Sequence, residues 1–392
     1  MFKKTLALLL AATMVYTMAA CGNVSSQEET SQTDAASEMT AFEIGAVPNT
    51  LAEDEDTLIS TYVDKFEQKT YSDPESDLSI TYNLYLPEDY NPSGSYPMIV
   101  FIGDSSCAGS DATVSLTQGR GGLVWATEEW QSVYPTIVAV PTYPETILDD
   151  HGSYTTTEYV ELTKRYIDYM SSEYAVDAER IYGTGQSMGC MTTLILASEY
   201  PDLYAACMFV DGQWDISTLK ELENQTFVYF AAEDDTNAWN GAQEVMAMLD
   251  SDSISYKYTQ WDGNWTVDEL SAAAQELFTE DEDRYFISWA TGTIEPKSGG
   301  MGGSGMPSGG FGGPGGTSVS GEMPSGGFGG PGGTSVSGEM SFGGSSENSA
   351  DTSGMSGGPG GGTDSSSYHM ASFDYAYNCI AVMEWLFRQS KE

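Results

Sequence analysis

The stretch that decides the fold runs from Arg180 to Ala197 and reads RIYGTGQSMGCMTTLILA. A short β-like run, Arg180 to Tyr182, leads into a glycine-rich turn, and an apolar run of helical character, Cys190 to Ala197, follows. The turn contains G-x-S-x-G at Gly185 to Gly189, which between a strand and a helix lifts a nucleophilic serine above a sheet. Glycine on either side leaves room where strand and helix crowd together. We therefore predict that Ser187 is a nucleophile.

The pentapeptide pattern by itself is weak evidence, because it occurs twice in this chain. The second match, Gly354 to Gly358, lies in low-complexity sequence with no strand before it and no helix after it. Only the match around Ser187 has the strand–turn–helix setting that the chemistry requires. The alternative for Ser187 is a structural glycine turn without chemistry, so the rest of the chain must supply a base, an acid and an oxyanion donor.

The composition excludes several classes of function. The chain of 392 residues carries 58 Asp and Glu against 14 Lys and Arg, a formal charge of −44. Nucleic acid is excluded as a partner, because a phosphate backbone requires basic side chains. With two histidines and neither an HExxH nor a CxxC motif, we expect no metal site and no cofactor.

The N-terminus predicts export and lipidation. Lys3 and Lys4 precede an apolar run from Thr5 to Tyr16, and Met18 to Cys21 resembles a bacterial lipobox. Residues 1–20 are therefore a predicted lipoprotein signal peptide, with Cys21 diacylated and the protein tethered outside the cytoplasmic membrane. The alternative is an ordinary secretory signal with a chance cysteine.

Two segments have the composition of disordered chain. Residues 21–57 are rich in Ser, Thr, Glu and Asp, which predicts an acidic, flexible tether. Residues 298–367 are dominated by Gly, Ser, Pro and Met and contain a 17-residue tandem repeat, Met306 to Glu322 and Met323 to Glu339. We predict a disordered insertion. The alternative is a loop that contacts cell wall or glycan through Phe311 and Phe328.

The remaining ranges, 58–297 and 368–392, carry the folding signals. Buried-strand patterns occupy 98–102, 136–140, 205–210 and 226–232, and helical spacing occupies 159–174 and 242–249. Strands that alternate with helices predict a mostly parallel sheet with helices on both faces. An amphipathic helix over 373–387 must pack back onto that sheet. We expect Ile294 and Tyr368, at the two ends of the insertion, to lie close together.

The base and the acid follow from their order in the chain. A catalytic serine needs a histidine to take its proton and an acid to orient that histidine. With the order Ser, acid, His, His369 is the predicted base and His151, which precedes Ser187, is a surface or rim residue.

The turn after the strand at 226–232 offers Asp234 as the acid, with Asp235 or Glu233 as substitutes; Asp211 is a weaker candidate. The predicted oxyanion donors are the N–H groups of Met188 and of Ser105 or Asp104.

Four cysteines besides Cys21 remain, and spacing alone cannot pair them. Cys190 and Cys207 have apolar surroundings and are expected to be core residues. The other two are Cys107 and Cys379.

Several motifs together resemble the α/β-hydrolase group that contains polyhydroxybutyrate depolymerase-like and feruloyl esterase-like serine esterases. They are Leu84 to Tyr90 with Tyr96 to Phe101, Arg180 to Met191, and His369 to Tyr377. The resemblance covers about 78–260 and the C-terminus, and it implies the α/β-hydrolase fold. The chain departs from the group at Gly103, where a histidine is usual, and at Ala231, where a glycine is usual.

These observations lead to one expected function. The chain is expected to be an extracytoplasmic, lipid-anchored serine hydrolase that cleaves carboxylic esters, small or polymeric, as a monomer through Ser187, His369 and Asp234. The acyl and alcohol groups are left open. The alternatives are a peptidase with the same triad and a non-catalytic binding or adhesive lipoprotein on a hydrolase scaffold.

Overall fold

The computed structural model describes residues 45–48, 54–279, 282–296 and 365–391, all of which belong to one unit, residues 42–392. The predicted signal peptide, Cys21, most of the predicted tether and nearly all of the predicted insertion lie outside the described residues.

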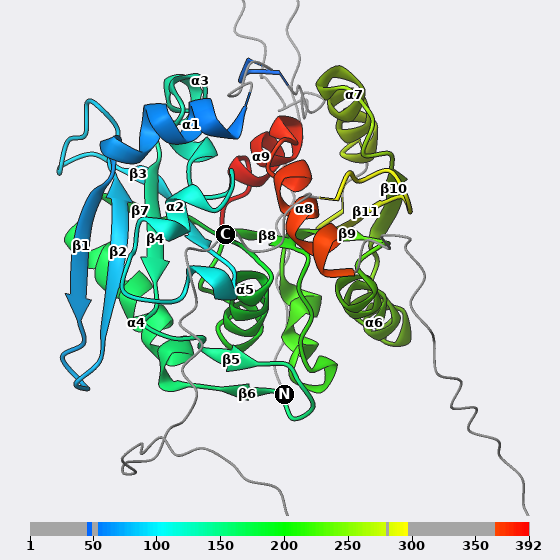
Figure 1. The fold of residues 1–392 in the computed structure, drawn as a ribbon, viewed down its shortest axis with the longest axis horizontal. Helices are drawn as coiled ribbons and strands as arrows, with labels where there is room; N and C mark the ends of the chain where they lie inside the picture. Colours follow the sequence, from blue (N-terminus) through cyan, green and yellow to red (C-terminus); the bar gives the residue numbers. More distant parts are fainter. Residues whose placement is uncertain (1–44, 49–53, 280–281, 297–364, 392) are drawn as a thin grey trace, which may run out of the picture. The chain divides into compact units, whose positions relative to one another are not determined.

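One mixed sheet forms the centre of this unit, with the strand order β1-β2-β4-β3-β7-β8-β9-β11-β10 (Figure 1). All pairs from β4 to β10 are parallel, whereas β2 pairs antiparallel with both of its neighbours, β1 and β4. A separate two-stranded ribbon pairs β5 with β6. The strands are β1 Glu67–Ser72, β2 Ser79–Tyr85, β3 Tyr96–Ile102, β4 Ile137–Thr142, β5 Leu148–Asp149, β6 Thr155–Thr156, β7 Val176–Gln186, β8 Ala206–Val210, β9 Phe227–Ala232, β10 Lys257–Trp261 and β11 Arg284–Trp289.

Helices cover both faces of the sheet, as predicted. One hydrophobic cluster joins a face of the sheet to α1, α2, α3, α7, α8 and α9, and a second joins the opposite face to α4, α5 and α6. Figure 1 shows α1, α7 and α9 in the upper half of the view and α4, α5 and α6 in the lower half. No helix in the described ranges is both long and apolar enough to cross a membrane. The helices are α1 Glu55–Tyr62, α2 Val114–Thr117, α3 Glu128–Val133, α4 Glu158–Glu173, α5 Met188–Glu199, α6 Thr236–Asp252, α7 Val267–Leu277, α8 Ser365–Ala376 and α9 Ile380–Phe387.

The period-two geometry of a strand explains why the central strands are apolar throughout. In β3, Ile99 and Phe101 pack into one cluster, whereas Val100 and Ile102 pack into the other. Because both faces are covered, every position of such a strand is buried, and the sequence reads as a continuous apolar run. The parallel order places the carboxyl ends of β3, β7, β8 and β9 at one edge of the sheet, where sites of such folds form.

The boundaries of the folded part differ from the prediction in two places. The predicted tether ends at residue 57, but α1 begins at Glu55 and Val47 is buried in the core. At the C-terminus the predicted single amphipathic helix is two helices, and α9 is buried along its whole length. His369 lies on the first of these two helices, α8, which begins at Ser365.

The two flanks of the predicted insertion meet on the sheet. The backbone N–H of Glu295 donates to the Tyr375 hydroxyl at 3.0 Å, and both Ile294 and Tyr368 pack into the hydrophobic cluster that contains α8. The chain therefore returns to the sheet beside the point where it leaves.

All four cysteines in the described ranges are free and buried. Cys190 and Cys207 are core residues, as expected, with their side chains fully enclosed. No disulfide therefore joins Cys107 or Cys379 to either of them.

Candidate active site

Ser187 occupies a sharp turn between β7 and α5. Its backbone has φ 52° and ψ −116°, a conformation that costs energy for a residue with a side chain and that recurs where a nucleophile is held out of a sheet. Gly189 makes the turn possible, because a Cβ at this position would lie 1.9 Å from the carbonyl oxygen of Ile102. A Cβ at Gly185 would lie 2.4 Å from the carbonyl carbon of Gly189. The elbow predicted from the pentapeptide is therefore present.

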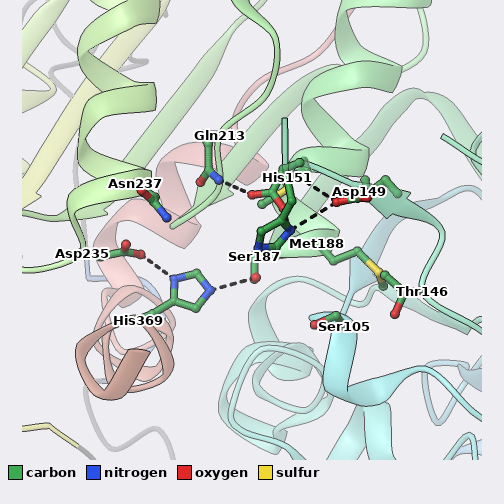
Figure 2. A pocket seen from close by; sticks show the side chains of 13 residues that line it. Ser105, Thr146, Asp149, His151, Ser187, Met188, Gln213, Asp235, Asn237 and His369 are labelled. Carbon is green, nitrogen blue, oxygen red and sulfur yellow. Dashed lines mark hydrogen bonds and ion pairs between the residues drawn. The ribbon is translucent and has the colours of Figure 1, made fainter. Parts of the chain in front are cut away.

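His369 bridges Ser187 and an aspartate (Figure 2). Its Nε2 lies 2.8 Å from the Ser187 Oγ, and its Nδ1 lies 2.5 Å from an Oδ2 of Asp235. The histidine side chain is 23% exposed and the Asp235 side chain 5% exposed, so solvent reaches the ring but hardly reaches the carboxylate. This is the geometry that a proton relay from a serine hydroxyl requires.

The electrostatics favour a histidine of increased basicity. Burial of the ring opposes the charged form and lowers the pKa of His369. The hydrogen bond and charge of Asp235 are the main causes that outweigh burial, and they raise the pKa of His369 above its ordinary value of 6.5. Asp235 thus holds the ring and stabilises the proton that the ring accepts.

The carboxylate that contacts His369 belongs to Asp235 and not to Asp234, the residue that the sequence analysis offered first. Asp235 is the N-cap of α6, where its side chain accepts from the Ala238 N–H, and its remaining oxygen faces His369. Asp234 points elsewhere and accepts from the Gly292 N–H at 2.7 Å. Adjacent residues in this extended turn direct their side chains apart, so only one of two neighbouring aspartates can contact the histidine.

Glu233, the other substitute that the sequence offered, is also turned away from His369. Its carboxylate contacts side chains of β10 and β11 and the turn that follows β11, namely Gln260, Ser288 and Thr291.

Helix α8, which carries His369, is fixed to the sheet by buried contacts. The hydroxyl of Tyr377, just after the helix, lies 2.9 Å from the Thr184 Oγ1 on β7, three residues before the nucleophile. The same ring packs edge-on against Phe101 of β3 at 5.6 Å. Near the C-terminal end of α8, Asp374 accepts from the Arg120 N–H at 3.0 Å. The position of His369 is therefore set by contacts far along the chain.

The two predicted oxyanion donors lie on the same side of Ser187. Met188 is the first residue of α5, so its N–H has no acceptor within the helix. Ser105 is the first residue of a 3-10 helix, Ser105–Cys107, whose N-cap Asp104 accepts from the Ser106 N–H at 2.7 Å. Met188 and Ser105 both line the cavity that contains Ser187. Both are therefore placed where a developing oxyanion could be bound.

A buried polar network, which sequence reasoning missed, connects this loop to the elbow. Gln186, the residue before the nucleophile, donates from Nε2 to the Gln118 Oε1 at 2.6 Å and to the Asp104 Oδ2 at 3.3 Å. The Cys107 thiol donates to the same Gln118 oxygen at 3.2 Å. Gly103 stands where the resemblance led us to expect a histidine, and a Cβ there would lie 2.7 Å from the Cys107 sulfur. The network couples the two parts of the site.

The cavity beside Ser187 has a volume of about 420 Å³. Its floor is formed by the groups described above, and its walls combine apolar side chains with acids and amides (Figure 2). The additional lining residues are Thr146, Leu148, Asp149, Asp150, His151, Met191, Gln213 and Asn237. Apart from His151, none of these residues was identified from the sequence, because none of them belongs to a recognisable motif.

His151 is a rim residue, as predicted, and its side chain is 91% exposed. Its Nδ1 lies 3.2 Å from an oxygen of Asp149 and 3.1 Å from one of Asp150, and Asp150 also accepts from Gln213 at 2.5 Å. The atoms of these two aspartates and of His151 that could act as metal ligands lie within 4.8 Å of one another. Exposed carboxylates commonly gather in this way without a metal ion, and the contacts with His151 and Gln213 account for the cluster.

Comparison with known proteins places this site in a family. Residues 75–277, slightly more than half of the chain, match the model of the family described as "Putative esterase". No curated protein sequence matches the chain. Among solved structures, a thermostable esterase is similar at 25% identity and a TM-score of 0.49, over 59% of this chain and 56% of that one.

Two further structures are similar at lower identity. The feruloyl esterase module from Clostridium thermocellum, complexed with sinapinate, is 14% identical over 58% of this chain and 80% of that one, with a TM-score of 0.42. S-formylglutathione hydrolase from Staphylococcus aureus is 13% identical over 49% of this chain and 88% of that one, with a TM-score of 0.37.

Proposed function

The chain belongs to this esterase family, and we propose, with that membership as the premise, that it is a serine hydrolase that cleaves carboxylic esters through Ser187, His369 and Asp235. The observation that carries the proposal is the continuous contact from the Ser187 Oγ through the His369 ring to Asp235. All three groups come from one chain, so a monomer suffices for activity.

The reaction begins when the Ser187 Oγ attacks the carbonyl carbon of the ester while His369 Nε2 takes the hydroxyl proton. Asp235 holds the proton on Nδ1, which leaves Nε2 free to accept. The N–H groups of Met188 and Ser105 bind the oxyanion that forms on the carbonyl oxygen. His369 then gives its proton to the departing alcohol, and the acyl group remains on Ser187.

The second half of the reaction repeats these steps with water. His369 removes a proton from a water molecule, which attacks the acyl carbon, and the acid leaves as Ser187 recovers its proton. A bond of the ester is thus replaced by bonds to the elements of water, with no cofactor.

The cavity supports a small acyl or alcohol group. A volume of about 420 Å³ lies at the lower end of the range for small-molecule sites. The apolar residues Leu148, Met188 and Met191 provide a surface for hydrocarbon, and Gln213 and Asn237 provide hydrogen bonds. Longer or polymeric substrates would extend out of this cavity.

We also propose that the enzyme acts outside the cell, anchored through lipidated Cys21. This part of the proposal rests on the sequence of residues 1–21, in which a charged start, an apolar run and a lipobox-like end occur in the expected order. Metabolic labelling with a fatty-acid analogue tests it: the wild type should be labelled and Cys21→Ala should not. A labelled Cys21→Ala variant contradicts the proposal.

Labelling with a fluorophosphonate probe tests the hydrolase proposal. Wild type should be labelled, and Ser187→Ala should not be. Ser356→Ala is the matched control, because Ser356 stands in the second G-x-S-x-G, and it should label like wild type. The same proteins are assayed with short p-nitrophenyl esters and with aminoacyl p-nitroanilides. Hydrolysis of the anilides in preference to the esters would replace the esterase with a peptidase, and an unlabelled wild type would end the proposal.

A further inference from the structure

Asp211 is a buried carboxylic acid that the proposed reaction does not use. It follows β8 directly, and β8 lies between β7, which ends at the nucleophile, and β9, which leads to Asp235. Its side chain is completely enclosed. Its backbone has φ 44°, in the left-handed region that a residue with a Cβ adopts only at a cost. A strained, buried acid between the two halves of a site needs a physical reason.

Hydrogen bonds connect this residue to both halves. Val210, its neighbour, accepts from the Ser187 N–H at 3.1 Å. The Asp211 Oδ1 accepts from the Ala232 N–H at 2.7 Å, and the Ala232 carbonyl accepts from the Asp235 N–H at 3.0 Å. A continuous path therefore runs from the nucleophile through Asp211 to the acid, and the side chain of Asp211 is its central link.

The second oxygen of Asp211 is buried without a hydrogen-bond partner, and no ion pair to this residue occurs in the described part of the chain. A carboxylate in such a place is unfavourable, because neither water nor a cation compensates its charge. Burial and then the charge of Asp235 raise the pKa of Asp211 to about 7. The titratable groups that face Asp211 are Asp235, His369, Cys190, Tyr229 and Tyr377.

We propose, resting on the function proposed above, that Asp211 is a positioning residue: as an uncharged acid it sets the spacing between Ser187 and Asp235. Asp235 is then the ionised carboxylate that holds His369. If Asp211 also ionised, two like charges would face each other in a water-poor interior, and their repulsion would act on the turn that presents Asp235.

Two substitutions distinguish the effect of the hydrogen bond that Asp211 accepts from the effect of a charge on its carboxyl group. Asp211→Ala removes the acceptor of the Ala232 N–H, and kcat should fall about tenfold to a hundredfold while KM changes little, since the acid turn is displaced and the cavity is not. Asp211→Asn keeps an acceptor oxygen but cannot ionise, so it should restore most of the lost kcat. If Asp211→Ala keeps the wild-type kcat, or if Asp211→Asn is as impaired as Asp235→Asn, the proposal fails.

The pH profile of kcat/KM reports whether Asp211 carries a charge. An ionised Asp211 would raise the pKa of His369. Because Asp211 is uncharged in the proposed arrangement, Asp211→Asn removes no charge, and the acid limb of its profile should coincide with that of wild type. An acid limb at lower pH in Asp211→Asn would show that Asp211 is ionised and would overturn the proposal.

Thermal unfolding tests the protonation of Asp211 without any substrate. The pKa of this group is about 7 in the folded protein and has an ordinary value of 3.8. Between pH 3.8 and about 7, Asp211 is ionised in the unfolded chain but still protonated in the folded protein. The free energy of unfolding of the wild type therefore falls as the pH rises through this range, and above about pH 7 this loss stays constant. The Tm of Asp211→Asn relative to wild type should therefore rise between pH 4 and 7 and level off.

Asp77→Asn, an exposed aspartate in the loop before β2, is the matched control and should show a flat difference. The two proposals can fail separately. A wild type that neither binds fluorophosphonate nor cleaves esters ends the proposed function, whereas the Tm gap still reports on Asp211. An active esterase ends the Asp211 proposal alone if the Tm difference between Asp211→Asn and wild type is the same at every pH, or if the acid limb moves to lower pH in Asp211→Asn.

Discussion

The Nε2 of His369 lies 2.8 Å from the Oγ of Ser187, although 182 positions separate the two residues along the chain. Much of this separation is the segment 297–364, outside the described residues. The direct bond between Glu295 and Tyr375 shows that the flanks of the segment meet. Because the cost of closing a loop grows only with the logarithm of its length, a long insertion can separate the base from the sheet without displacing it.

Replacing residues 298–364 with a short Gly-Ser linker should therefore preserve the site. We expect kcat/KM for a short ester to stay within about threefold of wild type, since the joined ends already lie together. The measurement is ester hydrolysis with fluorophosphonate labelling. A folded variant that has lost activity would show that the insertion, for example through Phe311 or Phe328, contributes to catalysis.

Replacing each of the two neighbouring aspartates by asparagine should affect kcat to very different extents. Asp235→Asn removes the carboxylate that orients His369, and kcat should fall by about ten thousandfold, as in serine triads that lose their acid. Asp234→Asn is the matched control and should change kcat by less than about threefold, because Asp234 contacts Gly292 instead. Steady-state kinetics on both variants decide the matter, and a larger loss in Asp234→Asn would contradict the assignment.

The pH dependence of kcat/KM should follow His369. Only the neutral imidazole can accept the serine proton, and the pKa of this histidine is raised above 6.5. Activity should therefore be lost, as pH falls, at a higher pH than an isolated histidine would cause. His151→Asn should leave the inflection in place, because His151 contacts the rim and not Ser187. An inflection below pH 6.5 would show that burial outweighs the carboxylates.

Glu384 should control stability. This buried side chain on α9 accepts from the Gly45 N–H through one oxygen and from the Val47 N–H through the other, each at 2.8 Å. Glu384→Ala leaves both donors unpaired and should lower the free energy of unfolding by about 2–4 kcal/mol. The exposed Glu276→Ala on α7 should change it by less than about 0.5 kcal/mol. Urea unfolding measures both, and equal midpoints would exclude a role for the contact.

The rim of the cavity should select substrates by charge. Asp149 and Asp150 line it, and no Lys or Arg among the described residues does, so a carboxylate on the substrate meets repulsion. A neutral ester should have a kcat/KM about tenfold higher than a hemisuccinate ester of similar size. This ratio of the two kcat/KM values should fall in high salt, which screens the repulsion. Asp149→Asn with Asp150→Asn should narrow the ratio. Glu88→Gln is the control and should leave the ratio unchanged, because Glu88 lies in the loop before β3, at the opposite end of that strand from the cavity. An unchanged ratio in the variant with both rim aspartates replaced contradicts the prediction.

The sequence determined the fold class, the family and the identity of two site residues. The apolar runs and the glycine turn around Ser187 are local signals, and the prediction of an esterase-like α/β-hydrolase is confirmed by the family match and the sheet. His369 followed because the chain has only two histidines and this one comes after every predicted strand. Met188 remains a predicted oxyanion donor, on the grounds of its place at the start of a helix.

Only the tertiary structure decided which carboxylate meets His369 and what surrounds the pair. The sequence cannot distinguish Asp234 from Asp235, because they are the same residue type at adjacent positions. The helix cap that turns Asp235 toward the His369 ring depends on how α6 leaves the sheet. Asp211 and Gln186 carry no motif, because their importance comes from hydrogen bonds to residues distant in the chain. Short sequence patterns indicate the contacts that a segment makes within itself. The roles of these side chains depend instead on their burial against strands and loops that are distant in the chain and that the sheet brings together.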